Sequence, residues 1–215
     1  MNHWEAEAAS WLAWTRTPGH DAYWRYRDAF FALVPGAGRA TLEIGCGEGR
    51  VCRDLAARGH TVTGVDAAPT LLRAAAEAHP EGTYLDGDAT ALPFPDASFD
   101  LVVAYNSLMD VADMPAAVAE AARVLAPGGA FCVCVTHPFT DALQESVGPY
   151  LDGGVYEGTF TRDGLTMTFH GWTHPLSAYT AALEAAGLRV DALREPADPF
   201  DPDRSWPMFL MLRAS

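Results

Sequence analysis

The sequence predicts an α/β fold built on a doubly wound, mostly parallel sheet. Short apolar runs alternate with helical patterns from residue 40 to residue 136, the rhythm of strands joined by crossover helices. The run 101–104 is apolar without alternation, as expected of a strand buried on both faces. The expected strands are 40–44, 61–66, 83–85, 99–104 and 130–136, and the expected helices are 50–58, 69–78 and 115–125.

Two segments outside this alternation are expected to cover the core. Residues 2–14 and 21–34 are rich in Trp, Tyr and Phe and predict two N-terminal helices. Residues 155–162 and 165–170 alternate on either side of Asp163-Gly164, a two-residue sequence typical of a β-hairpin. We expect the hairpin to act as a lid.

The remaining segments complete a single domain of 215 residues, long enough for a full core. The Gly-, Pro- and Asp-rich stretch 137–154 predicts a loop or a partly helical excursion, and a helix near 176–186 and strands near 188–194 and 208–212 follow. The expected parts are an N-terminal helical cap (1–38), a cofactor-binding core (39–136), an insertion (137–174) and the C-terminal part of the core (175–215).

The composition excludes several function classes. The formal net charge is −14, and all 14 cationic side chains are Arg. The acidic excess argues against a nucleic-acid partner, because phosphate backbones are bound by clustered Lys and Arg. The lack of Lys excludes Schiff-base chemistry and the P-loop lysine. The Ala- and Arg-rich usage is typical of a GC-rich bacterial source.

The expected compartment is the cytoplasm, with no membrane partner. No apolar run approaches membrane-spanning length, and no signal-peptide pattern begins the sequence. The four cysteines are Cys46, Cys52, Cys132 and Cys134, and no second Cys/His cluster has metal-ligand spacing. We therefore expect no metal site.

The most informative stretch is 43–49, which reads Glu-Ile-Gly-Cys-Gly-Glu-Gly. It follows an expected strand and precedes an expected helix, a place where Gly lets the backbone approach a ligand closely. The spacing is G-x-G-x-G, so its third glycine comes one residue earlier than in the dinucleotide pattern G-x-G-x-x-G. The stretch predicts a site for a nucleotide-like cofactor.

Two aspartates follow expected strands at the edge where doubly wound sheets bind ligands. Asp66 comes 21 residues after Gly45 (66 − 45), where a ribose-binding carboxylate is expected. Its alternative role is to begin the helix at Pro69. Asp88 lies in Gly87-Asp88-Ala89, a sequence that is also common in turns.

Five ordered motifs together resemble those of class I S-adenosylmethionine-dependent methyltransferases, and within them the small-molecule "type 11" group. The motifs are 43–49, Val65-Asp66, Gly87-Asp88-Ala89, Phe99-Asp100-Leu101-Val102 and the sequence Arg-Val-Leu-Ala-Pro-Gly-Gly at 123–129. The match runs from about Thr41 to Val135, and 174–188 is similar to a C-terminal segment of the same group. The resemblance implies a Rossmann-like sheet of seven strands with the last one antiparallel.

The resemblance also implies a cofactor, S-adenosylmethionine, with S-adenosylhomocysteine as its product. The three loop glycines would wrap its methionine part, Asp66 would accept hydrogen bonds from both ribose hydroxyls, and Asp88 with the Ala89 backbone would read the adenine. Asn106 would line the methionine moiety, and Glu43 would orient the loop. The expected cofactor residues are Glu43, Gly45, Cys46, Gly47, Gly49, Asp66, Ala67, Asp88, Ala89 and Asn106.

The motifs depart from the nucleic-acid- and protein-modifying subtypes. After the fourth strand the sequence reads Tyr105-Asn106-Ser107-Leu108, not the Asn/Asp-Pro-Pro-Tyr pattern of enzymes that methylate adenine or glutamine nitrogen. No Pro-Cys nucleophile, as used in cytosine carbon methylation, follows the sheet. No set of acidic residues resembles the divalent-metal site of catechol-type methyltransferases. The expected acceptor is a small molecule, methylated on O, N or C by a monomer or homodimer.

Three histidines are candidates for a general base, because the unperturbed pKa of histidine lies near neutrality. His137 directly follows the fifth strand and is expected to point toward the methyl end of the cofactor, with structural hydrogen bonding as its alternative role. His170 ends the predicted hairpin, and His174 precedes the returning helix, where it can instead bond backbone groups.

Aromatic side chains of the two covering segments are expected to line the acceptor pocket, although ordinary packing is the alternative. The expected acceptor-binding residues are Trp11, Trp14, Tyr23, Tyr156, Phe169 and Trp172. An aromatic lid favours a flat or apolar acceptor such as a natural-product intermediate.

Three alternatives to a methyltransferase stay open at this point. One keeps the cofactor but changes the reaction, such as a cyclisation or an elimination assisted by the sulfonium. A nucleotide-dependent oxidoreductase uses a similar sheet, but the compact glycine spacing and the later motifs disfavour it. A non-catalytic S-adenosylmethionine-binding protein would keep the same motifs, because a binding motif does not establish turnover.

Overall fold

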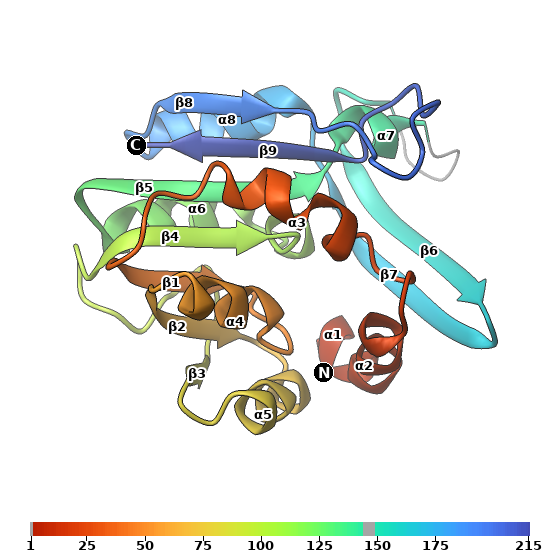
Figure 1. Ribbon diagram of the computed structural model, residues 1–215. Helices are drawn as coiled ribbons and strands as arrows, with labels where there is room; N and C mark the ends of the chain where they lie inside the picture. The colour runs from red at the N-terminus through yellow and green to blue at the C-terminus, as the bar shows by residue number, and fades with distance from the viewer. Residues whose placement is uncertain (1, 144–148) are drawn as a thin grey trace.

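The computed structural model describes residues 2–143 and 149–215. A seven-stranded sheet in the order β3-β2-β1-β4-β5-β9-β8 forms the centre of the molecule (Figure 1). Its strands are β1 (Ala40–Ile44), β2 (Thr61–Asp66), β3 (Thr83–Asp86), β4 (Phe99–Tyr105), β5 (Leu125–Thr136), β8 (Val190–Arg194) and β9 (Phe209–Ala214). The first five strands pair in parallel, and β9 is antiparallel to both β5 and β8. The predicted doubly wound, mostly parallel sheet with an antiparallel last strand is confirmed.

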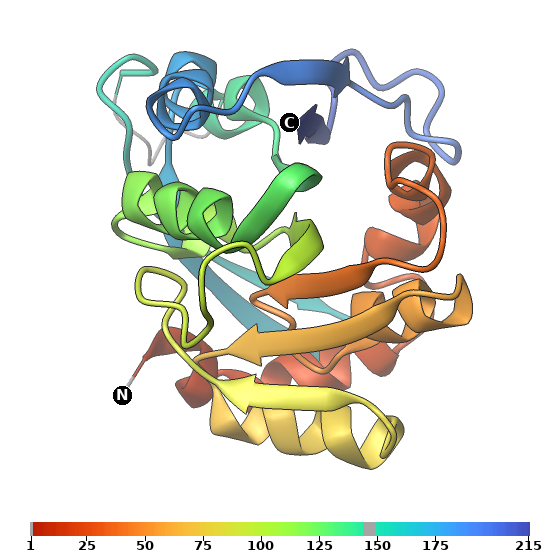
Figure 2. The same ribbon diagram turned by 90° about the vertical axis from the view of Figure 1, so that its left-hand side faces the viewer.

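Helices cover both faces of this sheet (Figure 2). The core helices are α4 (Arg50–Ala57), α5 (Pro69–Ala78), α6 (Met114–Val124) and α8 (Leu176–Ala185). The N-terminal segment forms α1 (His3–Ala6), α2 (Ala8–Arg16) and α3 (Tyr23–Phe31), and shorter elements are the 3-10 turn η1 (Leu108–Asp110) and α7 (Pro138–Ala142). The predicted helix 2–14 is therefore two helices, which meet at Glu7.

Two hydrophobic layers follow from the alternation of side chains along the central strands. On β4, Val102 and Ala104 pack with α6 and α8 on one face, whereas Leu101, Val103 and Tyr105 pack with α3 and α4 on the other. All five are buried, which explains why this strand shows no polar alternation in the sequence.

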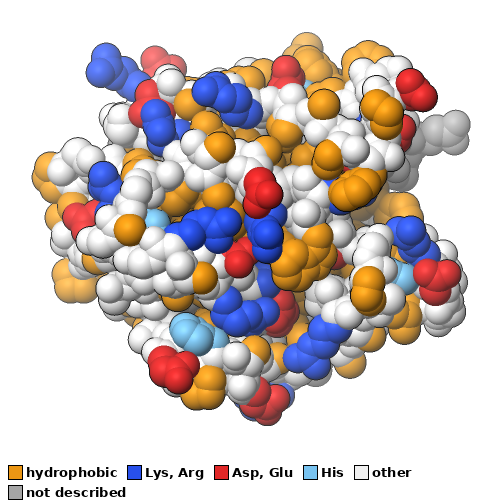
Figure 3. All heavy atoms as spheres, in the orientation of Figure 1, with side chains coloured by type: hydrophobic (Ala, Val, Ile, Leu, Met, Phe, Trp, Pro, Cys, Tyr) orange, Lys and Arg blue, Asp and Glu red, His pale blue; other side chains and the backbone are white. Residues whose placement is uncertain are grey.

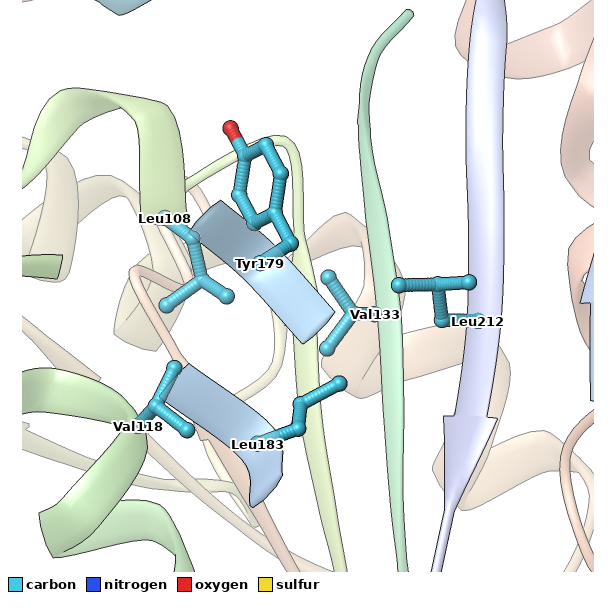
Figure 4. A pocket seen from close by; sticks show the side chains of 6 residues that line it. All are labelled: Leu108, Val118, Val133, Tyr179, Leu183 and Leu212. Atoms are coloured by element: carbon cyan, nitrogen blue, oxygen red, sulfur yellow. The ribbon is translucent and has the colours of Figure 1, made fainter. Parts of the chain in front are cut away.

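The space between α6, α8 and the sheet is filled tightly by aliphatic side chains and one tyrosine. Six residues meet there, as Figure 4 shows: Leu108, Val118, Val133, Tyr179, Leu183 and Leu212. The gap between these side chains does not admit a water molecule. This face of the sheet is thus a rigid support for the elements at its carboxyl edge.

The inserted hairpin leaves the main sheet and crosses toward the N-terminal helices (Figure 1). Its strands are β6 (Gly154–Arg162) and β7 (Leu165–Thr173), paired antiparallel around Asp163-Gly164 as predicted. Strand β7 runs to Thr173, three residues further than predicted, because Gly154 to Tyr156 continue the pairing. Segment 137–154 contains α7, and residues 144–148 of it lie outside the described residues.

Arg side chains gather on the face covered by α3 and α4 (Figure 3). Four of the arginines on α3, on α4 and directly after it are paired with a carboxylate: Arg25 with Asp198 at 2.6 Å, Arg27 with Asp28 at 3.3 Å, Arg53 with Glu48 at 2.7 Å, and Arg58 with Asp54 at 3.8 Å. Within the described ranges, no helix is long and apolar enough to cross a membrane.

Candidate cofactor and acceptor site

The glycine-rich loop joins β1 to α4 at the carboxyl edge of the sheet. Gly45, Gly47 and Gly49 have φ values of 69°, 53° and 78°, in the left-handed region that favours glycine. A Cβ on Gly45 would overlap the Ser107 side chain, whose Oγ would lie 2.9 Å away. A Cβ on Gly47 would meet only the Trp11 Nε1, at 3.8 Å. The loop is thus packed against Ser107 at Gly45, and at Gly47 it lies at van der Waals distance from the Trp11 ring.

Asp66, at the end of β2, fixes this loop. Its Oδ2 accepts a 2.7 Å hydrogen bond from the Gly47 N–H, and its Oδ1 accepts one of 2.8 Å from the Ala68 N–H. Burial raises the pKa of Asp66, while the two N–H donors oppose that shift. Each carboxylate oxygen keeps a further lone pair, so the side chain can accept ribose hydroxyls while holding the loop. The expected roles in ribose binding and in local turn structure are compatible.

Glu43 is buried beneath the loop, with 2% of its surface exposed. Burial is the main cause that raises its pKa to about 8; the nearby carboxylates of Asp66 and Glu48 act in the same direction, and a hydrogen bond from the Cys52 thiol opposes them. Its Oε2 has no hydrogen-bond partner among the described residues. Glu43 therefore carries a proton at neutral pH, and its expected role in orienting the loop stays a prediction.

Asp88 and Ala89 lie beyond β3, at the same edge. The Oδ1 of Asp88 accepts hydrogen bonds from the N–H and the hydroxyl of Thr90, at 2.8 and 2.7 Å. The exposed Asp88 side chain thereby keeps its second oxygen for another donor. The Gly87 N–H donates to the Asp66 carbonyl at 3.1 Å, which ties this turn to β2.

Asn106 and Ser107 complete the edge at the end of β4. Asn106 has φ 50°, and its buried Oδ1 has no partner among the described residues. The Ser107 hydroxyl donates a 2.7 Å bond to the Ile44 carbonyl, so β4 locks the end of β1. Ser107 belongs to none of the recognised motifs. The Asn106 oxygen, which has no partner among the described residues, fits a ligand that brings a hydrogen-bond donor to this edge.

The N-terminal helices close over this edge from the other side. The Asn2 Nδ2 donates to the Ala67 carbonyl at 2.8 Å, and Glu5 accepts hydrogen bonds from the N–H and hydroxyl of Thr70. Ala67, one of the expected cofactor residues, is thus bonded through its carbonyl to the cap. The cap is anchored directly on the segment that carries Asp66.

An aromatic cluster joins the N-terminal cap to the hairpin. The Phe169 ring on β7 lies 6.1 Å from the Trp11 ring, 6.2 Å from that of Trp14 and 6.4 Å from that of Trp4. Three of the predicted acceptor residues, Trp11, Trp14 and Phe169, therefore come together. Trp4 belongs to the same cluster, and its place in the predicted helix 2–14 could have suggested it.

Tyr23 lies elsewhere, in the layer under α3. Its ring packs edge-on against Tyr105 at 5.3 Å, and its hydroxyl donates to Asp54. Only 1% of its surface is exposed. Arg50, paired with Asp21, lies between the Tyr23 and Trp11 rings, 4.7 and 5.1 Å from their centres. The geometry gives Tyr23 a packing role, and its contact with an acceptor stays a prediction.

His137 is fully buried and caps α7. Its Nδ1 accepts a 3.2 Å hydrogen bond from the Phe139 N–H, so its Nε2 carries the proton and donates to Glu195 Oε1 at 2.8 Å. Both ring nitrogens are thus engaged within the fold. The geometry favours the structural alternative, and a catalytic role for His137 stays a prediction.

His170 and His174 lie on β7 and just after it. The His170 Nδ1 is 3.6 Å from Glu157 Oε2, and its ring packs 5.4 Å from Trp172 and 5.3 Å from His3. The His174 Nε2 is buried without a hydrogen-bond partner among the described residues, and burial lowers the pKa of this ring. His174 is therefore a neutral imidazole at pH 7.

The thiol of Cys46 is buried in the glycine loop, beside Cys52 of α4. A Cβ on Gly64 would lie 2.8 Å from the Cys46 sulfur and 2.9 Å from that of Cys52. The hydrogen bond between the two thiols, together with burial, raises the pKa of Cys52 well above its usual range. The same hydrogen bond lowers the pKa of Cys46, but burial and the nearby carboxylates outweigh it, so that pKa is also raised. The Cys46 side chain thus points into the core, where it packs with Cys52 and Leu72. Across the described ranges no group of three or more His, Cys, Asp or Glu side chains is placed to hold a metal ion.

Comparison with known proteins identifies this arrangement. Residues 42–133 match a family described as a methyltransferase domain. A demethylmenaquinone methyltransferase of Thermus thermophilus is 40% identical over 187 residues, which cover 80% of this chain and 84% of the relative. One from Tropheryma whipplei is 38% identical over 121 residues, covering 55% of this chain and 50% of the relative. The chain spans about half the length, or less, of the first curated relatives it matches.

Solved structures share the fold. An S-adenosylmethionine-dependent methyltransferase from Mesorhizobium loti superposes with a TM-score of 0.72 at 24% identity, covering 90% of this chain and 97% of the other. A structure from Listeria monocytogenes gives 0.74 at 20% identity, covering 90% and 98%. The relatives and the ordered motifs at the carboxyl edge agree, and the chain belongs to the class I S-adenosylmethionine-dependent methyltransferases, whose cofactor is S-adenosylmethionine.

Proposed function

We propose that this protein transfers a methyl group from S-adenosylmethionine to a small-molecule acceptor. The proposal rests on three residues at the carboxyl edge of the sheet, Gly47, Asp66 and Asn106. The first two are joined by a 2.7 Å hydrogen bond, and the third holds a buried oxygen that has no partner in the part of the chain that the structure describes. Bound there, the cofactor supplies an electrophilic methyl group on a sulfonium and a thioether leaving group.

The residues of the chain would act mainly by positioning. Asp66 would hold the ribose while its bond to Gly47 keeps the loop closed, and Asp88 would accept from the adenine amino group. Asn106 would accept from the donor groups of the methionine moiety. Alignment of the acceptor with the methyl carbon in a dry pocket can contribute up to roughly 7–11 kcal/mol of the rate enhancement.

The cap and the hairpin would exclude water from this space. α1 is hydrogen-bonded to the β2–α5 segment, and the rings of α2 pack on Phe169 of β7. We propose that these elements line the acceptor side, with Tyr156 and Trp172 among the contacts and His170 or His174 as a base where the acceptor must lose a proton. In this proposal the acceptor is aromatic or apolar, of the size of a natural-product intermediate.

The names of the curated relatives suggest acceptor classes for this protein by analogy. Their names specify demethylmenaquinone and malonyl-[acyl-carrier protein] as acceptors. We further propose that the protein is cytoplasmic and acts as a monomer or homodimer. In this proposal it binds neither nucleic acid nor membrane.

Calorimetry tests the proposal first. Titration with S-adenosylmethionine, S-adenosylhomocysteine and NADH should show micromolar binding of the first two alone. An acceptor screen should then detect release of S-adenosylhomocysteine. Binding of NADH alone would support the oxidoreductase alternative, and cofactor binding without turnover of any acceptor would support a non-catalytic binding protein.

A further inference from the structure

A cavity of about 250 Å³ lies at the amino ends of β2 and β3, beside α4. The cofactor residues Asp66 and Asp88 lie at or beyond the carboxyl ends of the same two strands. The cavity is therefore separate from the cofactor edge, and the methyl transfer proposed above assigns it no role.

His60, which directly precedes β2, brings a hydrogen-bond acceptor to this cavity. It lines the cavity and is only 7% exposed. The Thr41 hydroxyl donates to the Arg39 carbonyl at 3.2 Å and also lies 3.1 Å from His60 Nδ1. Because a hydroxyl has one proton, both bonds form together only when Nδ1 carries a proton of its own and donates it to Thr41. The Nε2 of His60 is then an acceptor, and no described residue shares a hydrogen bond with it.

The His60 ring is neutral at pH 7 and so keeps this acceptor. Burial lowers its pKa, and the nearby guanidinium groups of Arg39 and Arg58 lower it further. Neither arginine lines the cavity, and Arg58 is paired with Asp54 at 3.8 Å.

A second group of polar side chains lines the cavity from the segment that leads into β3. The Tyr84 hydroxyl lies 3.2 Å from His79 Nδ1, and burial raises the pKa of Tyr84, so the hydroxyl keeps its proton and donates to the ring. The His79 Nε2 then carries the ring proton and lies 3.8 Å from Glu81 Oε2. A Cβ on Gly82 would lie 2.6 Å from both His79 Nδ1 and Tyr84 Cε2, so glycine leaves room for these two rings to meet.

Tyr84 also separates the cavity from the glycine loop. A Cβ on Gly49 would lie 3.0 Å from both Cε1 and the hydroxyl of Tyr84. The cavity is thus closed toward the cofactor by an aromatic ring, and a ligand in it would not reach the cofactor edge.

The cavity is rich in acceptors and has no arginine among the ten described residues that line it. The free acceptors are His60 Nε2, the Glu81 carboxylate and the second lone pair of the Tyr84 hydroxyl. Ala56 and Val62 add apolar surface. An anion bound here would meet acceptors without a lining cation, whereas a cation would meet a carboxylate and an aromatic ring.

We propose that this cavity is a second ligand site, which binds a small organic cation whose charged group carries N–H donors. The N–H groups donate to His60 Nε2 and to the Glu81 carboxylate, and the apolar part of the ligand lies against Ala56 and Val62. The formal net charge of −14 attracts such a ligand over a longer range. The inference goes beyond the proposed methyl transfer and does not rest on it.

Benzamidinium, benzamide and benzoate share a ring and a size, and they test the preference for a donor-bearing cation. Each is titrated at pH 7 while the backbone amide shifts of Gly82 and Thr83 are followed by NMR. For a ligand of this size we expect benzamidinium to bind with a Kd of about 1 mM. Benzamide should bind about fivefold more weakly, because its hydrogen bonds carry no charge, and benzoate more weakly still.

A pair of matched variants locates the site. Ala56→Leu fills part of the cavity and should weaken benzamidinium binding at least fivefold, whereas Ala57→Leu, the same change at the exposed next position of α4, should leave its Kd within about twofold. Glu81→Gln should weaken benzamidinium two- to threefold, since an exposed carboxylate is screened, and exposed Glu77→Gln should not. Nitrogen shifts of the His60 ring should show the proton on Nδ1.

Four results would overturn the inference: no shifts at Gly82 and Thr83, benzamide or benzoate binding as tightly as benzamidinium, equal affinities of Ala56→Leu and Ala57→Leu, or a His60 proton on Nε2. Displacement of benzamidinium by S-adenosylhomocysteine would place the probe at the cofactor edge and would also overturn it. Failure of the proposed function is distinct, because S-adenosylhomocysteine would then not bind, and the benzamidinium titration is still made on the free protein.

Discussion

The backbone N–H of Gly47 donates a 2.7 Å hydrogen bond to Oδ2 of Asp66, and this bond couples the glycine loop to the neighbouring strand. The same carboxylate accepts from the Ala68 N–H at 2.8 Å and so shapes the turn that leads into α5. One side chain thus orders two loops that approach the cofactor from different strands. Loss of its charge should disturb both loops together.

Asp66→Asn should weaken binding of S-adenosylhomocysteine by about 10- to 100-fold. The amide keeps the size of the side chain, but its NH2 group cannot accept a hydrogen bond from Gly47, Ala68 or a ribose hydroxyl. Losses of about 1.5–3 kcal/mol accompany removal of hydrogen bonds to charged groups. Calorimetry at pH 7 measures the change. Asp86→Asn is the matched control, because exposed Asp86 pairs with Asp66 in the β2–β3 register. Equal affinities of the two variants would contradict the role of Asp66.

Gly45→Ala should lower the free energy of unfolding by about 3 kcal/mol or more, measured by urea denaturation. The new Cβ would overlap Ser107 in a backbone with φ 69°, so steric overlap adds to backbone strain. Gly164→Ala separates the two effects. Gly164 has φ 78°, and a Cβ there would meet no atom within 4 Å, so only strain of about 1 kcal/mol is expected. Similar losses at the two positions would show that Ser107 does not confine the loop.

Glu43→Gln should flatten the dependence of stability on pH. The folded state holds a proton on Glu43 up to about pH 8, whereas the unfolded chain releases it near 4.5. In this window the folded state binds more protons, so the contribution of Glu43 to stability is greatest at low pH and declines as pH rises. The decline amounts to about 3–5 kcal/mol between pH 4.5 and 8.

Denaturation of the wild type and Glu43→Gln at several pH values between about 5 and 8 measures this slope. The variant should be the more stable of the two at the upper end of this range, because Gln carries no proton to lose. Exposed Glu77→Gln controls for the loss of one charge. A slope that is unchanged in Glu43→Gln would mean that this carboxyl is ionised in the folded protein.

The sequence was sufficient for the core of the sheet because the signals there are local. Strands β1 and β2 begin and end at the predicted residues, and the run 101–104 lies in β4, which is buried on both faces. Gly45 to Gly49 and Asp66 were recognisable because loop geometry demands those residue types in that order. The hairpin was recognisable from Asp163-Gly164 and the alternation on either side of it.

On the acceptor side, the directions of the side chains are set by contacts between residues far apart in the sequence, which no short sequence pattern predicts. The direction of the His137 ring is set by Glu195, 58 residues later in the sequence. Leu108 and Tyr179 belong to elements that look like an ordinary turn and an ordinary helix, and they meet only in the folded chain, where both line the space between α8 and the sheet. The prediction that His137 would point to the methyl end rested on its place after β5, a position that fixes the backbone but leaves the ring free to turn.

His137→Ala distinguishes the two roles of this ring. If the ring acts structurally, its removal leaves a cavity and an unpaired Phe139 N–H, and the free energy of unfolding should fall by about 2–4 kcal/mol. The Kd for S-adenosylhomocysteine should stay within about twofold, and so should turnover measured at a temperature where the variant is fully folded. His79→Ala, at a half-buried histidine without such a cap, should cost less. A variant with wild-type stability and greatly reduced turnover would instead establish His137 as the base, and would require Glu195 to release the ring when an acceptor binds.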